Sequence, residues 1–156
     1  MTGVQTCALP ISANNPTGYS FTDEDWDNLI AVIKDVASPE LPIALLIDVA
    51  YIDFAGDEEE YRHFLPKLET LPEYVLPIIA YSISKTFTCY SMRCGAIICM
   101  AKTKEIADEF ALVCKYSSRG SWSNSTRAPQ VAIVKIYNDE ALLGRQIGRA
   151  SCRERV

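Results

Sequence analysis

An uninterrupted apolar run, residues 43–47, ends directly at Asp48 and restricts the fold more than any other segment of the chain. A run of this length without polar alternation is typical of a strand buried on both faces, as in a parallel sheet. Further strands are predicted over residues 75–81, despite Pro77, and over residues 95–100. Because helical patterns alternate with these strands, the sequence predicts an α/β fold with a layered sheet.

The clearest helix is predicted over residues 21–37, where apolar side chains recur at helical spacing. Thr22 can cap its first turn, and Asp25, three residues later, can complete a capping box. The pair Ser38-Pro39 ends this helix. Three more helices are predicted, over residues 57–65, 104–115 and 127–137.

The two ends of the chain resemble translated sequencing adapters rather than native protein sequence. Residues 3–11 and residues 146–156 can each be encoded by one of the two adapters commonly used in short-read sequencing. We therefore predict that residues 1–11 and 146–156 are foreign, and that residues 12–145 are a piece of a longer chain. The last segment carries three Arg and one Glu, so excluding it takes the formal net charge from -5 to -7.

Charge and composition exclude several classes of partner. A net negative chain gives no reason to expect nucleic acid or an anionic membrane surface as a partner. No apolar run is long enough to span a bilayer, and no secretory signal is visible. Cys89, Cys94 and Cys99 are five residues apart, which is not the spacing of a metal site. We expect buried free thiols in a reducing cytoplasm and no bound metal.

Four short motifs carry side chains with useful chemistry. Taken singly, each has a plain structural interpretation, because N-P and Gly mark turns, an aspartate can cap a turn, and Lys and Arg are ordinary surface residues. Two of them nevertheless follow predicted strands directly, and ligands bind at the carboxyl ends of strands in α/β sheets. The motifs are Asn15-Pro16-Thr17-Gly18, Asp48-Val49-Ala50-Tyr51, Ser82-Ile83-Ser84-Lys85 and Arg93-Cys94-Gly95.

The order and spacing of these motifs resemble those of the fold-type-I aminotransferases, the class I aspartate and aromatic branch in particular. That family shows N-P-x-G, D-x-A/G-Y, S-x-S/A-K and R-x-G in this order. Here Asn15 and Asp48 are 33 residues apart, Lys85 follows 37 residues later, and Arg93 another eight residues on. The resemblance implies part of the large domain of these enzymes, a mostly parallel sheet with flanking helices that binds pyridoxal 5'-phosphate (PLP).

The resemblance also implies what each side chain does. Lys85 would form a Schiff base with the cofactor aldehyde and later move the proton from the substrate Cα. Asp48 would keep the pyridine nitrogen protonated, so that the ring can accept electrons. Tyr51 and Asn15 would hydrogen-bond the phenolic oxygen of the ring.

Phosphate and substrate binding follow from the same resemblance. Ser82 and Arg93 would bind the phosphate, since a guanidinium offers a planar fork to two oxygens. Arg119 begins the segment R-G-S-W-S-N, which resembles the family's R-x-x-Y-S-N with Trp122 in place of tyrosine. In the family this arginine reaches the partner subunit's site and binds a side-chain carboxylate, which implies amino acid and 2-oxo acid substrates and a homodimer. The alternative is a surface arginine near a helix start.

Other interpretations of the motifs are open. The segment from Ser82 to Lys85 also fits the S-x-x-K of penicillin-binding proteins, but no K-T-G follows, because Lys104 stands in the place of the glycine. Aminotransferase-like domains also act as ligand sensors in transcription regulators, which would require a DNA-binding domain upstream. The family's upstream phosphate-binding turn and its downstream small domain are not in this sequence. We therefore predict that the 156-residue chain is inactive by itself.

Overall fold

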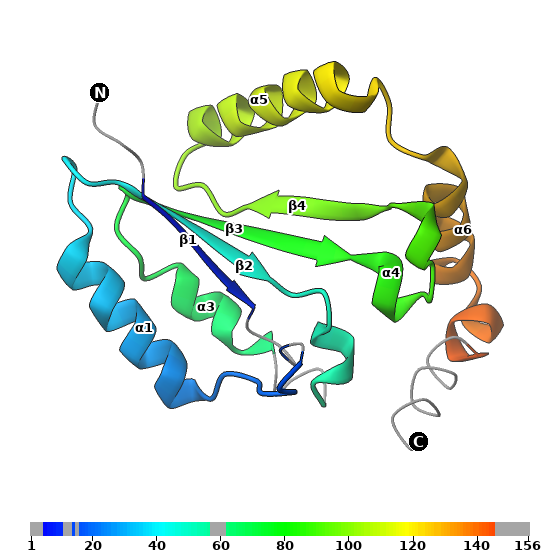
Figure 1. The fold of residues 1–156 in the computed structure, drawn as a ribbon, viewed down its shortest axis with the longest axis horizontal. Coiled ribbons are helices and arrows are strands. Elements are labelled where there is room, and N and C mark those ends of the chain that lie inside the picture. The colour runs from blue at the N-terminus through cyan, green and yellow to red at the C-terminus, as the bar shows by residue number, and fades with distance from the viewer. Residues whose placement is uncertain (1–4, 11–13, 15, 57–61, 146–156) are drawn as a thin grey trace.

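The computed structural model describes residues 5–10, 14, 16–56 and 62–145, and within them the strands form one sheet. The sheet order is β1-β2-β3-β4 (Figure 1). The first three strands run parallel, and β4 runs antiparallel to β3. The prediction of an α/β fold with a mostly parallel sheet is confirmed. The bounds are β1 Gln5–Pro10, β2 Ile43–Asp48, β3 Val75–Ser82 and β4 Gly95–Cys99.

The helices predicted over residues 21–37, 104–115 and 127–137 are present. The helix predicted over residues 104–115 is longer than predicted and ends at Trp122. The helix predicted over residues 57–65 is wrong in its end. Residues 57–61 lie outside the described residues, and the helix that follows runs past residue 65, because Pro66 falls in its first turn, where no backbone donor is needed. The helical elements are α1 Asp23–Val36, η1 Ile52–Phe54, α3 Phe64–Leu68, α4 Ile83–Thr86, η2 Tyr90–Met92, α5 Lys104–Trp122 and α6 Arg127–Tyr137.

The predicted capping box fixes the start of α1. The Thr22 hydroxyl accepts a hydrogen bond from the Asp25 backbone N–H at 3.2 Å, and the Asp25 carboxylate accepts one from the Thr22 N–H at 2.8 Å. Two otherwise unpaired donors of the first turn are satisfied in this way. With its start fixed in this way, α1 packs its apolar side, which carries Trp26, Ile30 and Ile33, against the sheet.

The core lies between the sheet and the helices α1 and α3. Trp26 of α1 stacks on Phe64 of α3, with ring centroids 4.5 Å apart and planes 2° from parallel. Leu45 and Ile47 of β2 are fully buried in the same cluster. The alternate residue Leu46 is only half-buried, so the prediction that this strand is buried on both faces holds for one face within the described residues.

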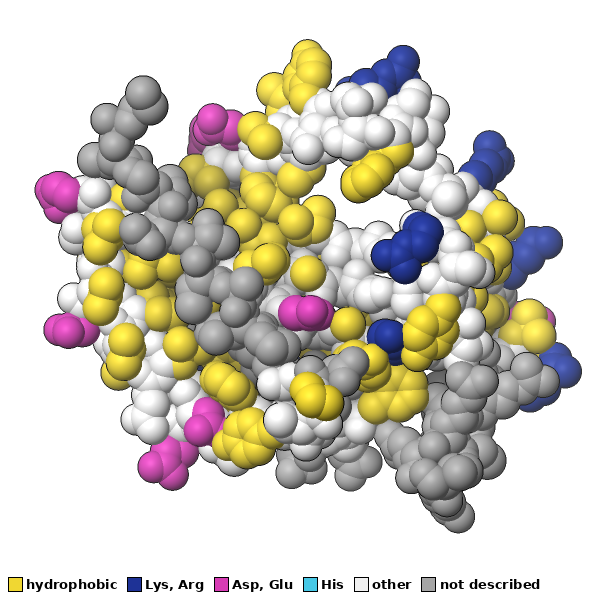
Figure 2. All heavy atoms as spheres, viewed as in Figure 1, with side chains coloured by type: hydrophobic (Ala, Val, Ile, Leu, Met, Phe, Trp, Pro, Cys, Tyr) yellow, Lys and Arg dark blue, Asp and Glu magenta, His cyan; other side chains and the backbone are white. Residues whose placement is uncertain are grey.

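The region of β4 and α5 is far less covered. Ile97 and Ile98 of β4 are about half exposed, and α5 buries none of its residues within the described part of the chain. Figure 2 shows hydrophobic side chains on the surface of this region. None of the described helices is long and apolar enough to cross a lipid bilayer.

Strand β1 lies within the segment predicted to be foreign. It pairs in parallel with β2 over its whole length, Gln5 opposite Ile43 and Pro10 opposite Asp48. Strand pairing uses backbone groups that every residue except proline offers in full, so foreign sequence can occupy a strand position. The origin of residues 1–11 and 146–156 stays a prediction.

Candidate active site

Two of the sequence motifs meet at the carboxyl ends of neighbouring strands. Asp48 is the last residue of β2 and lies opposite Ala80 of β3. Ser82 is the last residue of β3 and lies opposite Gly95 of β4. Because β2 and β3 are parallel, both motifs emerge at the same edge of the sheet (Figure 1). Ligands bind at this edge in open α/β sheets.

The carboxylate of Asp48 is exposed at the end of β2. It accepts a hydrogen bond from the Ala50 N–H at 2.9 Å, which fixes it in a turn. Val49 between them is buried, and its N–H donates to the Ala80 carbonyl at 3.0 Å. The buried valine and the turn together hold an accessible negative charge at the strand end.

Lys85 lies between two tyrosine rings. Its Nζ is 5.1 Å from the ring centroid of Tyr51 and 4.1 Å from that of Tyr90. Hydrogen bonding to Tyr51, and more weakly to Tyr90, stabilises the ammonium and raises the pKa of Lys85 above its ordinary value. The predicted neighbourhood of Lys85 and Tyr51 is therefore present. The lysine carries a proton at neutral pH in this arrangement, and it must lose that proton to attack an aldehyde.

The Lys85 turn is held rigidly by its neighbours. Ser82 caps α4, its hydroxyl accepting from the Ser84 N–H at 3.3 Å. Ile83 and Ser84 are buried beneath the turn, and the Ile83 N–H donates to the Cys94 carbonyl at 3.3 Å. The turn is thereby tied to the start of β4, the strand that follows Arg93.

Arg93 has a left-handed backbone, with a φ of 50°. This conformation is uncommon for a residue with a side chain and needs support from its surroundings. The Thr126 hydroxyl gives that support by bonding the carbonyls of Met92 and Arg93, at 2.8 and 3.2 Å. The Arg93 guanidinium is exposed and donates to the Tyr90 carbonyl at 3.2 Å. Tyr90 thus links Arg93 to Lys85.

The glycine of the R-x-G motif has a steric reason. A Cβ on Gly95 would lie 2.4 Å from the Tyr81 carbonyl oxygen, a backbone atom that cannot turn away. We expect Gly95→Ala to lower the free energy of unfolding by about 1–3 kcal/mol, because β3 and β4 must move apart. Gly120→Ala is the matched control. Gly120 lies within α5 with nothing near its Cβ position, so alanine should stabilise the helix by about 0.5–1 kcal/mol. Urea denaturation of both variants measures the contrast, and equal midpoints would contradict this explanation.

A network that the sequence motifs did not indicate adjoins Lys85. Asp53 of η1 accepts hydrogen bonds from Tyr81, Thr86 and Arg62. Burial, with the negative charge of Asp53 as a lesser cause, raises the pKa of Tyr81 to about 12. Only sequence proximity could have pointed to these residues, because Asp53 is two residues from Tyr51 and Thr86 adjoins Lys85.

Of the predicted site residues that the structure describes, Arg119 is not joined to this group. Asn15 lies outside the described residues. Arg119 is exposed in the last turn of α5, which lies beyond β4 and away from α4 in Figure 1. The alternative that Arg119 lies near a helix start is wrong, because α5 continues to Trp122.

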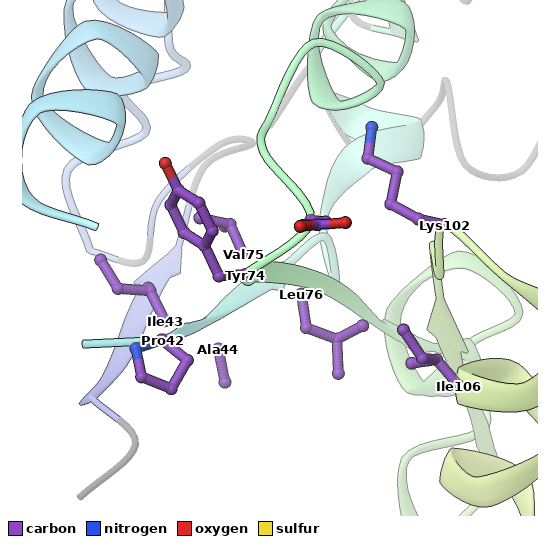
Figure 3. Close-up of a pocket in the computed structure, with 9 residues that line it drawn as sticks. Pro42, Ile43, Ala44, Tyr74, Val75, Leu76, Lys102 and Ile106 are labelled. Carbon is purple, nitrogen blue, oxygen red and sulfur yellow. The ribbon is translucent and has the colours of Figure 1, made fainter. Parts of the chain in front are cut away.

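A cavity of about 220 Å³ lies elsewhere, at the amino ends of β2 and β3 (Figure 3). Tyr74, Leu76 and Ile106 line it, with Lys102 at its rim. It is at the opposite end of the strands from Lys85. Ligands of α/β sheets bind at the carboxyl ends, so we assign no part of the candidate site to this cavity.

The cysteines take no part in the site. Cys89, Cys94, Cys99 and Cys114 are free, and each is partly exposed rather than fully buried as predicted. Cys99 and Cys114 lie in β4 and α5, the two elements with little cover among the described residues. No cluster of His, Cys, Asp or Glu among the described residues has the arrangement of a metal site.

Known proteins resemble this chain in sequence. The family described as "Aminotransferase class I and II" matches residues 9–150. The aromatic-amino-acid aminotransferase of Escherichia coli is 28% identical over 130 residues, which are 83% of this chain and 31% of that protein. The aspartate aminotransferase of Haemophilus influenzae is 32% identical over 133 residues, with the same coverage of both proteins. The chain thus spans about a third of the length of the curated relatives it matches.

Solved structures show the same relationship. An aminotransferase from Anaerococcus prevotii superposes with a TM-score of 0.86 and is 35% identical, covering 94% of this chain and 36% of that one. The aromatic-amino-acid aminotransferase of Burkholderia pseudomallei, solved covalently bound to pyridoxal phosphate, shares the fold with a TM-score of 0.80 at 20% identity, covering 94% and 35%. From the match over residues 9–150, this chain belongs to the class I and II aminotransferases.

Proposed function

We propose that the protein containing this chain is a PLP-dependent aminotransferase, which moves an amino group between an amino acid and a 2-oxo acid. The observation that carries the proposal is the position of Lys85 beside Tyr51, at the end of the strand next to the one that ends in Asp48. Membership of the family and the enzyme names of the relatives support catalysis rather than ligand sensing.

The side chains present fit this cofactor. The edge of the sheet offers an amine, an accessible carboxylate, a phenol, a hydroxyl and a guanidinium, which suit an aldehyde, a ring nitrogen, a phenolic oxygen and a phosphate. PLP supplies the aldehyde that captures amino groups and a ring that accepts electrons from the substrate. The residues in this set are Lys85, Asp48, Tyr51, Ser82 and Arg93.

Each residue then has a defined task. Lys85 would hold the cofactor through its Nζ, and once the substrate amine has replaced it, the freed Lys85 amine would take the proton from the substrate Cα. Tyr51 would help to keep this proton on the Lys85 amine, because its hydrogen bond stabilises the ammonium. The Asp48 carboxylate keeps a proton on the ring nitrogen. Ser82 and Arg93 hold the phosphate, and Asn15 bonds the phenolic oxygen as the resemblance implies.

The substrate class and the assembly are finer parts of the proposal. We propose substrates of the aspartate or aromatic class, with Arg119 binding a side-chain carboxylate in the site of a partner subunit. The exposed position of Arg119 at the end of α5 supports a role outside its own subunit. The enzyme would then be a homodimer, and we propose the cytoplasm as its compartment, because the described cysteines are free.

The extent of the chain is also part of the proposal. We propose that residues 1–11 and 146–156 are foreign and that this 156-residue chain does not turn over substrate by itself. Long reads of the source DNA across both junctions test the first statement, since native ends would read through unchanged. Ordinary transamination by this chain alone would contradict the second.

Cofactor attachment tests the proposal directly. The chain is incubated with one equivalent of PLP, reduced with borohydride and mapped by mass spectrometry. We expect Lys85 to carry most of the label. Its raised pKa makes it a poor nucleophile by itself, so a preference for Lys85 must come from the surrounding site.

Lys104 serves as the internal control for this experiment. It is highly exposed and pairs with a carboxylate one turn away on α5, that of Asp108. Equal labelling of Lys104 and Lys85 would mean that PLP reacts without a site. The proposed cofactor would then be wrong for this chain.

A further inference from the structure

A half-buried carboxylate, that of Asp53, receives donors from three separate segments. The Thr86 hydroxyl of α4 donates to Oδ2 at 2.6 Å, and the Tyr81 hydroxyl of β3 donates to the same oxygen at 3.2 Å. The Arg62 guanidinium donates to Oδ1 at 3.1 Å. The side chain of Asp53 is 22% exposed, so water screens these bonds little. We call these four residues the Asp53 network.

The Asp53 network joins the two segments that carry Tyr51 and Lys85. Asp53 lies in η1, which begins directly after Tyr51, and Thr86 adjoins Lys85 in α4. The same two segments meet a second time where the Lys85 Nζ lies 5.1 Å from the Tyr51 ring. The hydrogen bond between Thr86 and Asp53 therefore holds the two segments together. The contact between Lys85 and Tyr51 is the one to which we assign the chemistry.

We propose that Asp53 is a positioning residue, which holds Tyr51 against Lys85 through its hydrogen bond from Thr86. The inference rests on the proposed function, since it gives the Tyr51–Lys85 contact its purpose. A hydrogen bond to a charged acceptor is about twice as strong as one between neutral groups, which suits a single residue that must fix two short helical turns.

Several charged and titratable groups of the described residues face this contact. Lys85 faces the hydroxyls of Tyr51 and Tyr90. Asp53 accepts a hydrogen bond from Arg62 and faces Tyr81, whose pKa is raised to about 12. The charge interaction with Tyr137 of α6 also raises the pKa of Tyr81. Tyr81 therefore keeps its proton near pH 8, where the reactivity of Lys85 is compared.

The test measures how fast Lys85 reacts with a small amine reagent as a function of pH, in the 156-residue chain, with mapping by mass spectrometry. Thr86→Val keeps the shape of the side chain and removes the donor without changing any charge. When Tyr51 is no longer held in place, the ammonium loses stabilisation, and we expect Lys85 to react about threefold faster near pH 8. Asp53→Asn should act in the same direction.

Thr86→Ser is the matched control, because it keeps the hydroxyl, and it should leave the pH profile of Lys85 as it is in the unsubstituted chain. Lys34 of α1 reports on folding, since it bonds Thr70 far from the network. Unchanged Lys85 reactivity in T86V and D53N would overturn the proposal. So would a rise at Lys34 equal to that at Lys85, because the network would then act on folding as a whole.

The outcome for this inference is separate from the outcome for the proposed function. If PLP fails to select Lys85 in the unsubstituted chain, the proposed function fails whatever the amine reagent shows. If PLP selects Lys85 but T86V leaves its reactivity unchanged, only the role of Asp53 fails.

Discussion

Lys85→Ala is expected to lower transamination by the complete enzyme about ten-thousand-fold, the upper end of what a positioned proton donor and acceptor contributes. The physical reason is twofold. Under the proposed function, alanine would remove the amine that holds the cofactor and the base that takes the proton from the substrate Cα. Stopped-flow or steady-state assays with an amino acid and a 2-oxo acid measure the loss.

Lys104→Ala is the control for this change. It also removes one lysine, but from an exposed position on α5. Its turnover should equal that of the unsubstituted enzyme. Retention of even a tenth of the activity in the Lys85→Ala enzyme would show that another residue performs the proton transfer. The assignment of the site would then have to be abandoned.

Trp26→Ala should have the largest effect on stability. The indole is 2% exposed, stacks on Phe64 at 4.5 Å and also meets Phe21 edge-on at 5.7 Å. Truncation leaves a cavity between α1, α3 and the sheet, and we expect a loss of about 3–5 kcal/mol in the free energy of unfolding. Urea denaturation followed by far-UV circular dichroism measures it.

Val32→Ala on the same helix separates core packing from helix propensity. Val32 is 60% exposed, so its truncation should change the free energy of unfolding by no more than about 0.5 kcal/mol. If both variants of α1 unfold at the same urea concentration, the core is not where the structure places it.

The positions of Lys85 and Asp48 at strand ends could be predicted from sequence because they depend on the order of residues along the chain. Lys85 follows a strand at the distance that a tight turn requires, and Asp48 ends the neighbouring strand. Relations between residues that lie close together in the chain can be recognised from the sequence alone. The capping box at Thr22 was predictable for the same reason, since its two partners are three residues apart.

The supports of the site could not be predicted in this way. The Asp53–Thr86 bond joins residues 33 positions apart, and nothing in either segment marks the other as its partner. Thr126 stands at the N-cap of α6, where a threonine usually bonds its own helix, yet its hydroxyl bonds the loop carrying Arg93 instead. Tertiary contacts of this kind replace the local bond that the sequence indicates.

The direction of β4 was within reach of sequence reasoning. A parallel return needs a crossover of about a dozen residues or more, usually with a full helix, and residues 83–94 hold only short turns. Residues 83–94 are twelve residues, which is at that limit, so the antiparallel pairing of β3 with β4 is explained by the lack of a full helix among them and not by length alone. The half-exposure of Ile97 and Ile98 could not be predicted, because an apolar sequence pattern does not show which other elements will cover the strand.

This antiparallel return also bears on the order in which the site assembles. Residues 83–94 join β3 to β4, whereas β2 reaches β3 through residues 49–74, a connection about twice as long and correspondingly more costly in loop-closure entropy. The hairpin that carries Lys85 and Arg93 can therefore form early and by itself. Asp48 and Tyr51 arrive only when the slower parallel pairing is made. A chain caught between these steps would already present its lysine and arginine, but without the carboxylate and phenol that complete the candidate site.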